Sequence, residues 1–177
     1  KWNAPTTAKP LNDLRTGIQY LASIGVTAKY LLGNSTTFDM LLECDQIKDA
    51  LITIMGTNVG FLDTDTVEEI IRRKVKLEMI SYDKMYKDYD GTEKKFYPDN
   101  YVTIIGSIQL GNTWYGTTPE ERTLLDDPKV DVAVLDRGVA TAVKTDYGPP
   151  VQVSTTASQI VLPSFEGMDS IYVIKVA

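Results

Sequence analysis

The sequence predicts an α+β fold, with a mixed body of helices and strands over residues 1–130 and a strand-built portion over residues 131–177. Apolar residues recur at helical spacing in several segments before residue 130. The later segments are short β-branched runs that are separated by turns. The boundary is a soft one, because a chain of 177 residues could also form one compact unit.

The first elements alternate between helix and strand. Four apolar residues at helical spacing predict an opening helix, and they are Leu11, Leu14, Ile18 and Leu21. Gly25 stands where a helix commonly ends in the left-handed conformation, and residues 26–32 are predicted as a short buried strand. Residues 34–37 supply candidate N-caps for a helix through Leu42, and Asp45 is expected to cap the next helix.

The middle of the chain is predicted to contain a loop, a helix and a hairpin. Residues 56–65 are glycine-rich and polar, and residues 66–69 have capping-box spacing before a short helix. Residues 79–96 are predicted as a long hairpin that turns at Asp90-Gly91, and residues 101–105 as a central strand. Turn glycines follow, and Thr118-Pro119-Glu120-Glu121 predicts a further short helix through Leu125.

Strands dominate the last third of the sequence. Turn residues, among them Asp146-Tyr147-Gly148-Pro149-Pro150, separate the predicted strands. The strands are expected over residues 130–135, 139–144, 151–154, 160–162 and 171–176.

Composition excludes several kinds of active site. The chain contains no histidine, so a Ser-His-Asp triad, a Cys-His pair and a histidine zinc site cannot form within it. Cys44 is the only cysteine and is expected to be a small buried side chain. A formal net charge of −6 argues against nucleic-acid binding as a primary task. Catalysis by carboxylate, lysine or tyrosine side chains stays open on composition, although linear spacing reveals no such site. No catalytic, cofactor-binding or metal-binding residue is predicted.

Three local patterns allow a functional interpretation beside a structural one. Asp63 and Asp65 could share a divalent cation, as in sugar-nucleotide enzymes, but a cap by Asp65 or Thr66 is the simpler interpretation. Arg72-Arg73-Lys74 lies among glutamates and is expected to form a solvated ion-pair network. The tyrosines of residues 79–96 alternate with aspartates, which favours contact with a neighbouring protein over base stacking.

Several of these motifs together resemble the major capsid protein E family of tailed bacteriophages, which is typified by the lambda head protein. Trp2 with Pro5, Asp13-Leu14, and the helix, strand and helix that end at Ile47 carry the first part of the resemblance. Residues 111–120, 146–150 and 162–165 carry the rest.

The resemblance implies an HK97-like capsid subunit. Residues 1–130 would correspond to the axial domain, and residues 131–177 to strands that return to the peripheral domain. The N-terminal arm, extended loop and spine helix of that family have no counterpart in the sequence, so the chain is expected to be the C-terminal part of a subunit.

The implied function is that of a structural protein, not an enzyme, which self-assembles into pentamers and hexamers of a shell in the bacterial cytoplasm. The implied location is the virion capsid. Copies of the chain would be the main partners, with scaffold, maturation protease and decoration protein as further ones. Packaged DNA would be contacted only non-specifically, and a membrane not at all. Two alternatives remain open: a metal-dependent carbohydrate- or nucleotide-processing enzyme that uses Asp63 and Asp65, and an encapsulin-like nanocompartment that encloses protein cargo.

Overall fold

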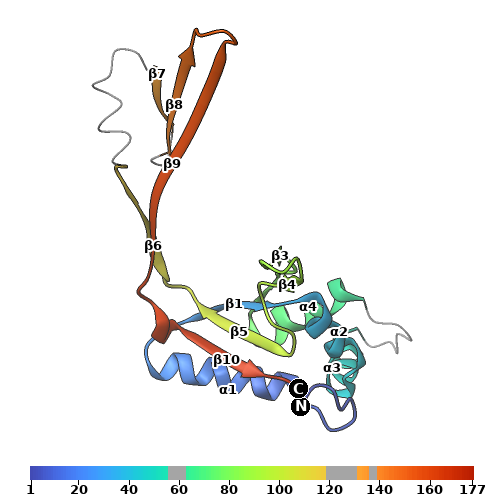
Figure 1. Ribbon diagram of the computed structural model, residues 1–177. Helices are drawn as coiled ribbons and strands as arrows, with labels where there is room; N and C mark the ends of the chain where they lie inside the picture. The colour runs from blue at the N-terminus through green and yellow to red at the C-terminus, as the bar shows by residue number, and fades with distance from the viewer. Residues whose placement is uncertain (56–62, 119–130, 136–138) are drawn as a thin grey trace. The chain divides into compact units, whose positions relative to one another are not determined.

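The computed structural model of the chain (Figure 1) describes residues 1–55, 63–118, 131–135 and 139–177. Two compact units result: unit 1 consists of residues 1–109 and 167–177, and unit 2 consists of residues 110–166. This division differs from the soft boundary expected near residue 130. The reason is that the last strand of the chain pairs with a strand of unit 1, so unit 2 is an insertion. The correspondence to axial and peripheral domains stays a prediction.

A four-stranded sheet forms the centre of unit 1. Its order is β10 (Ile171–Lys175), β5 (Tyr101–Gly106), β1 (Ala28–Gly33) and β2 (Glu78–Ser81). β5 pairs antiparallel with both of its neighbours, whereas β1 and β2 are parallel. The predicted strands at 26–32, 101–105 and 171–176 are confirmed, and β5 is a central strand as expected.

Four helices belong to unit 1: α1 (Pro10–Ser23), α2 (Ser35–Glu43), α3 (Asp45–Met55) and α4 (Thr64–Val75). α1 runs along β10, β5 and β1 (Figure 1). Gly17 allows this close approach, because a Cβ at that position would lie 2.6 Å from Ile104 Cδ1 and 2.7 Å from Tyr172 Cδ1. The helix predicted from residues 11–21 is therefore confirmed, together with the face that it buries.

Two of the predicted helix ends are confirmed: Gly25 follows α1 in the left-handed conformation, with a φ of 81°, and Asn34 caps α2. Asn34 Oδ1 accepts the Thr37 N–H at 2.9 Å, as a capping side chain should. Asp45 is the first residue of α3, where the carbonyl of Cys44 accepts the first N–H groups of the helix, so its predicted capping role is wrong. The cap of α4 is Asp63, whose carboxylate accepts the Thr66 N–H at 2.8 Å; the cap predicted at Asp65 or Thr66 is wrong because the helix begins at Thr64.

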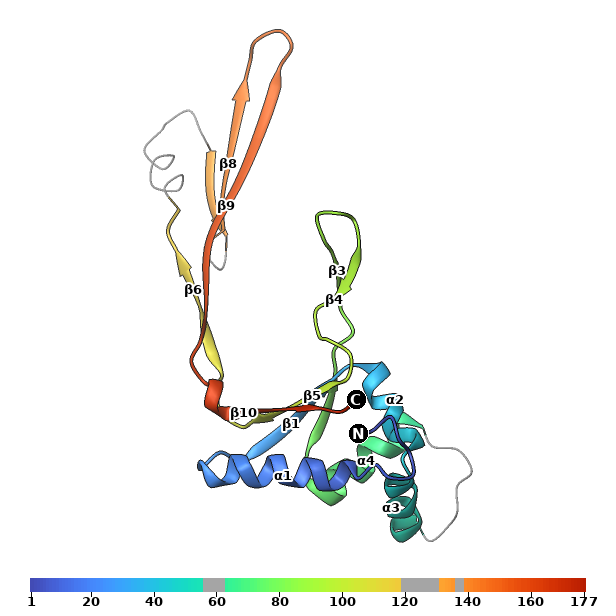
Figure 2. The same ribbon diagram turned by 60° about the horizontal axis from the view of Figure 1, so that its bottom comes forward.

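The long hairpin predicted over residues 79–96 is shorter than expected. Its first part is β2, which pairs in parallel with β1 and therefore does not belong to the hairpin. Val75 and Leu77, which precede β2, are buried in the core. The hairpin itself consists of β3 (Met85–Lys87) and β4 (Glu93–Lys95), as Figure 2 shows. Gly91 has a φ of 82° in the turn, which glycine adopts without strain.

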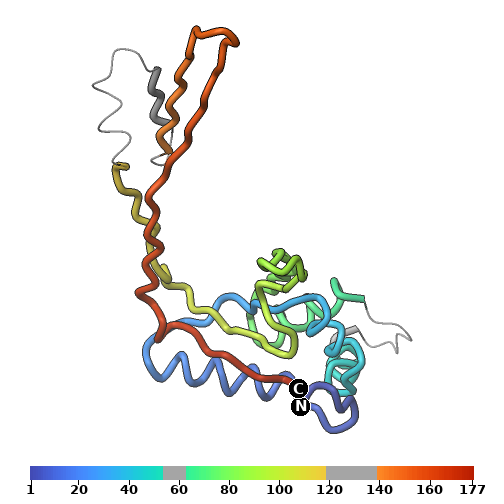
Figure 3. Tube along the Cα trace, in the orientation of Figure 1, coloured from blue at the N-terminus to red at the C-terminus, as the bar shows by residue number. Residues whose placement is uncertain are grey.

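Unit 2 is an antiparallel sheet of order β6 (Gly111–Gly116), β9 (Gln152–Phe165), β8 (Val139–Asp146) and β7 (Asp131–Leu135). In Figure 3 the tube of β9 follows both β6 and β8. Two strands were predicted, at residues 151–154 and 160–162, where the structure has the single strand β9. The mostly polar residues 155–159 between them do not interrupt it. The turn predicted at residues 146–150 joins β8 to β9.

The segment that begins at Gly111 was predicted as a turn and a capped helix, and its first part is instead strand β6. A Cβ on Gly111 would lie 1.9 Å from the backbone oxygen of Ser164, so only glycine fits this close pairing. The helix predicted from residues 118–125 and most of the loop at residues 56–65 lie outside the described residues.

The two ends of the chain meet in unit 1. The Trp2 N–H donates to the carbonyl of Val176 at 2.6 Å, and the indole Nε1 of Trp2 donates to Asp13 Oδ2 at 2.9 Å. Trp2 is 1% exposed and joins a core that also contains Cys44, which is buried as predicted. The N-terminal segment is therefore an integral part of the core.

Replacement of Trp2 by alanine should destabilise unit 1 by about 3–5 kcal/mol, because it leaves a cavity in the core and removes the indole N–H that donates to Asp13 Oδ2. Urea unfolding followed by the circular dichroism of the helices measures this loss. Trp114→Ala, at an exposed position of unit 2, is the matched control and should change the free energy of unfolding by less than about 0.5 kcal/mol. Equal effects of the two substitutions would contradict the assignment of Trp2 to the core.

Candidate interaction surfaces

The sheet of unit 2 exposes apolar side chains on both faces. Trp114 is paired with Leu162 on one face, and these side chains are 59% and 64% exposed. Tyr115, paired with Val161, lies on the opposite face, because successive residues of a strand point to opposite sides. Further exposed apolar residues of this sheet are Val143, Val153, Ile160 and Phe165.

Among the described side chains of unit 2, the buried apolar ones are the two small residues Ala140 and Ala142. An antiparallel sheet normally packs one face against another layer, and no helix of the described part of unit 2 supplies one. Contiguous exposed apolar surface of this kind marks a place where proteins associate. The sheet of unit 2 is therefore a candidate interaction surface on both of its sides.

The β3–β4 hairpin is a second candidate surface, and it carries the aromatic residues that the sequence singled out. The Phe96 ring lies 4.8 Å from the Tyr86 ring and 6.5 Å from the Tyr82 ring, measured between centroids. Tyr89 stands at the turn and is fully exposed. Tyrosine at such a position can bury a large area in a partner while losing little conformational freedom.

Carboxylates attach the base of this hairpin to the N-terminus of α2. Asp83 Oδ1 accepts the backbone N–H and the hydroxyl of Ser35, both at 2.9 Å, and Asp83 Oδ2 accepts the Ser81 hydroxyl at 2.6 Å. Asp99 Oδ1 accepts from Asn34 Nδ2 at 2.5 Å and from Lys95 Nζ at 2.7 Å. The hairpin is thus held by hydrogen bonds to charged groups, which are stronger than neutral ones.

These bonds also set the ionisation of the two carboxyl groups. The hydroxyl of Ser81, followed by the backbone and hydroxyl of Ser35, lowers the pKa of Asp83 below its ordinary value of 3.8. The bond from Lys95 does the same for the pKa of Asp99. Because the folded state lowers both pKa values, their contribution to stability is present at neutral pH and is lost as the pH falls through them.

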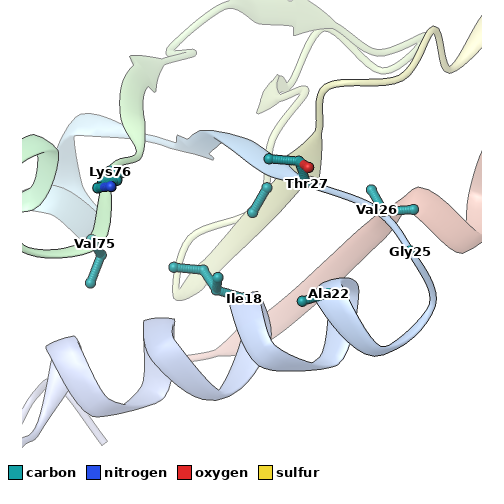
Figure 4. Close-up of a pocket in the computed structure, with 8 residues that line it drawn as sticks. Ile18, Ala22, Gly25, Val26, Thr27, Val75 and Lys76 are labelled. Atoms are coloured by element: carbon teal, nitrogen blue, oxygen red, sulfur yellow. The ribbon is translucent and has the colours of Figure 1, made fainter.

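A third candidate surface is an apolar pocket of about 390 Å³ in unit 1 (Figure 4). Ile18 and Ala22 of α1 form one wall, residues 25–28 form a second, and Val75 with Lys76 closes the third. Figure 4 shows Ile18 and Ala22 on the helix and Val75 with Lys76 across from them. The pocket holds no pair of reactive groups, so it suits the binding of an apolar side chain better than chemistry.

The acidic and basic patterns of the sequence occupy structural positions. Asp63 caps α4, and the side chain and backbone of Thr66 lower its pKa. Asp65 lies in the first turn of α4, near Glu68, Glu69 and Arg72. Within the described ranges no group of three acidic or cysteine side chains could hold a metal ion. That Asp63 and Asp65 are not metal ligands stays a prediction.

The basic cluster at residues 72–74 forms the last turn of α4. Arg73 pairs with Glu69 at 2.6 Å, one helical turn away, in an exposed salt bridge. Positive charge at a helix C-terminus also interacts favourably with the helix dipole. Of the expected ion-pair network, the pair of Arg73 with Glu69 is confirmed.

Among the described helices, none is long and apolar enough to span a lipid bilayer.

Neither a family model nor a curated protein matches the chain. Solved structures do match it. A candidate capsid protein of a prophage of Escherichia coli CFT073 is 16% identical, with a TM-score of 0.65 over 100% of this chain and 50% of that one. A phage-related protein from Bordetella bronchiseptica RB50 is 12% identical, with a TM-score of 0.60 over 99% of this chain and 51% of that one.

The fold of this chain is a phage capsid-like fold. The chain spans about half the length of the solved structures that it matches. At 12% and 16% identity the likeness concerns the fold alone. The expected mixed α/β class is confirmed, whereas the E family and the HK97-like topology stay predictions.

Asp83→Asn should weaken unit 1 at neutral pH, because an amide offers one acceptor oxygen where the carboxylate accepts three bonds. The difference from the natural chain should shrink as the pH falls below 3.8, the ordinary pKa of the group, and vanish once the pH is below the lowered pKa of Asp83 in the folded chain. Urea unfolding at a series of pH values measures it. Asp39→Asn, which removes an exposed carboxylate of α2, is the control. A stability gap that stays constant down to strong acid would contradict this role of Asp83.

Asp63 can be tested as a cap and as a metal ligand at the same time. Asp63→Ala should lower the thermal stability of α4, whereas Asp63→Asn should preserve it, because asparagine caps a helix as well as aspartate does. Titration with Mn²⁺ followed by calorimetry should show no saturable binding to the natural chain. Saturable binding that both substitutions abolish would establish the metal site and refute the purely structural interpretation.

Proposed function

We propose that this chain is a structural, non-enzymatic subunit of the head of a tailed phage or prophage. In this proposal copies of the subunit associate into pentamers and hexamers, and these build an icosahedral shell that encloses DNA. The finer assignment is a subunit of the major capsid protein E family with HK97-like architecture. Its place is the virion capsid, after assembly in the cytoplasm of the bacterial host.

The observation that carries the proposal is the agreement in fold with the prophage candidate capsid protein over 100% of this chain. Both structural units take part in that agreement, so it extends beyond a common sheet-and-helix core. The protein from Bordetella bronchiseptica, which is described as phage-related, supports the same assignment independently of sequence.

The exposed surfaces support self-association as the mechanism. A closed ring forms when one patch of a subunit meets a different patch on the next copy. Unit 2 offers apolar surface on both faces of one sheet, and unit 1 offers a hairpin and a pocket. Surfaces that differ from one another in this way are what a ring of identical subunits requires.

Composition is compatible with a container for DNA. A net charge of −6 disfavours tight binding of phosphate, so a packed genome would be contacted without being held. A nanocompartment would need the same self-association, but the matching structures are of phage and prophage origin, which favours the viral assignment. A scaffold, a maturation protease and a decoration protein are partners that the proposal includes.

Electron microscopy of the protein made from its complete gene, together with any scaffold and protease encoded beside it, tests the proposal. The expected result is rings or closed shells that contain this chain. Particles made only of monomers under all conditions would refute it.

A substitution in unit 2 makes the test specific. Trp114→Ser removes an apolar anchor from the exposed sheet and should reduce shell formation at least tenfold, on the order of an interface hot spot. Tyr147→Ser, at the exposed turn between β8 and β9, is the control for loss of an exposed aromatic side chain. Unchanged assembly of the Trp114→Ser protein would show that this sheet face is not an interface.

A further inference from the structure

We propose that the β3–β4 hairpin of one copy inserts Tyr89 into the apolar pocket between α1 and α4 of the next copy. This inference deepens the proposed function and rests on it, because it names two surfaces through which subunits would join. It commits the pocket to one occupant, which is a second copy of this chain.

The hairpin has the form of a preorganised anchor. The Gly91 N–H donates to the Asp88 carbonyl and the Asp88 N–H to the Thr92 carbonyl, both at 2.9 Å, so the turn is closed by its own backbone. The Asp90 carboxylate accepts the Thr92 N–H at 2.9 Å. Tyr89 is therefore fully exposed on a rigid support, and little freedom is lost when it binds.

The pocket has the size and lining that such a side chain needs. Its volume of about 390 Å³ lies near the lower end of the range of about 300–1,000 Å³ that is typical of binding pockets. Ile18, Ala22 and Val75 contribute apolar side chains to the lining (Figure 4), and an aromatic ring in the pocket would contact them. One aromatic side chain fits this space, whereas a folded element does not.

The charges at the two sites are opposite. Asp88 and Asp90 flank Tyr89, and Asp90 forms no salt bridge with a described residue. Lys76 lines the pocket, is exposed, and likewise has no acidic partner in the part of the chain that the structure describes. A carboxylate beside the tyrosine can therefore pair with Lys76 when the ring enters the pocket.

The two sites lie at opposite ends of one parallel strand pair. The pocket is formed by residues 25–28 and 75–76, which lead into β1 and β2. The hairpin is attached by Asp83 to Ser35 and Ser81, which lie where β1 and β2 end. A copy cannot place its own Tyr89 in its own pocket, so occupancy requires another copy.

This geometry produces a head-to-tail contact. Each copy would give a hairpin to one neighbour and receive a hairpin from the other, which is the kind of contact that closes into a ring. A reciprocal twofold dimer would instead occupy both hairpins and both pockets at once, and it would give covalent dimers without higher oligomers on cross-linking.

Cysteine cross-linking tests the contact directly. The double variant Asp88→Cys with Ala22→Cys keeps the Tyr89 ring and places one thiol beside it and one in the pocket, while the natural Cys44 is buried. Mild oxidation should give a ladder of covalent oligomers on a non-reducing gel. Asp88→Cys with Thr16→Cys is the matched control, because Thr16 is exposed on α1 but does not line the pocket. A ladder that is absent, or equal in both variants, would overturn the proposal.

Sedimentation velocity supplies a readout without a cross-link. Tyr89→Ala should weaken self-association of the chain about tenfold or more, whereas Tyr147→Ala should not. Asp90→Lys and Lys76→Asp should each weaken it, and the two substitutions in one chain should restore it. Restoration supports the predicted pairing, and failure to restore it contradicts that pairing.

The outcomes separate this inference from the proposed function. Shells that form normally with Tyr89→Ala would refute the hairpin contact and leave the capsid assignment standing. A specific ladder from a protein whose complete gene product forms neither rings nor shells would support the contact and refute the capsid assignment.

Discussion

The pairing of β10 with β5 is the contact on which unit 1 depends. β5 lies between β1 and β10, so without β10 one edge of a central strand would be unpaired. β10 also brings Tyr172 and Ile174 against the core, and the residue that follows it accepts the N–H of Trp2. Helix packing, sheet completion and attachment of the N-terminus thus rely on eleven residues, 167–177, that lie beyond unit 2 in the sequence.

Local patterns predicted the local elements well. The apolar spacing of α1 and the Asn34 cap of α2 act within a few residues, and the sequence alone was enough to place them. Long-range pairing was beyond such patterns. Nothing near residues 171–175 indicates that their partner is residues 101–105, and nothing near β2 indicates a parallel neighbour. β9 was divided in the prediction because residues 155–159 are mostly polar. Polar residues can continue this strand because most of its side chains are exposed to solvent.

The candidate surfaces were predictable to different degrees. The alternation of tyrosine with aspartate indicated an exposed hairpin, which the structure places at β3 and β4. Its contact with another protein stays a prediction. The pocket could not be foreseen, because Ile18 and Val75 lie far apart in the sequence and meet only through the packing of α1 with α4. Asp63 was considered from the sequence as a possible ligand of a divalent cation. Its role as a cap could not be foreseen, because it depends on where α4 begins.

The insertion of unit 2 has a consequence for the order of events during synthesis. Ribosomes add about 5–20 residues per second, so several seconds separate the appearance of β5 from that of β10. During this interval the nascent chain already carries the apolar strands β6 and β9, while the sheet of unit 1 still lacks its edge strand. Unit 1 of such a chain therefore gains its edge strand only after the whole of unit 2 has been synthesised.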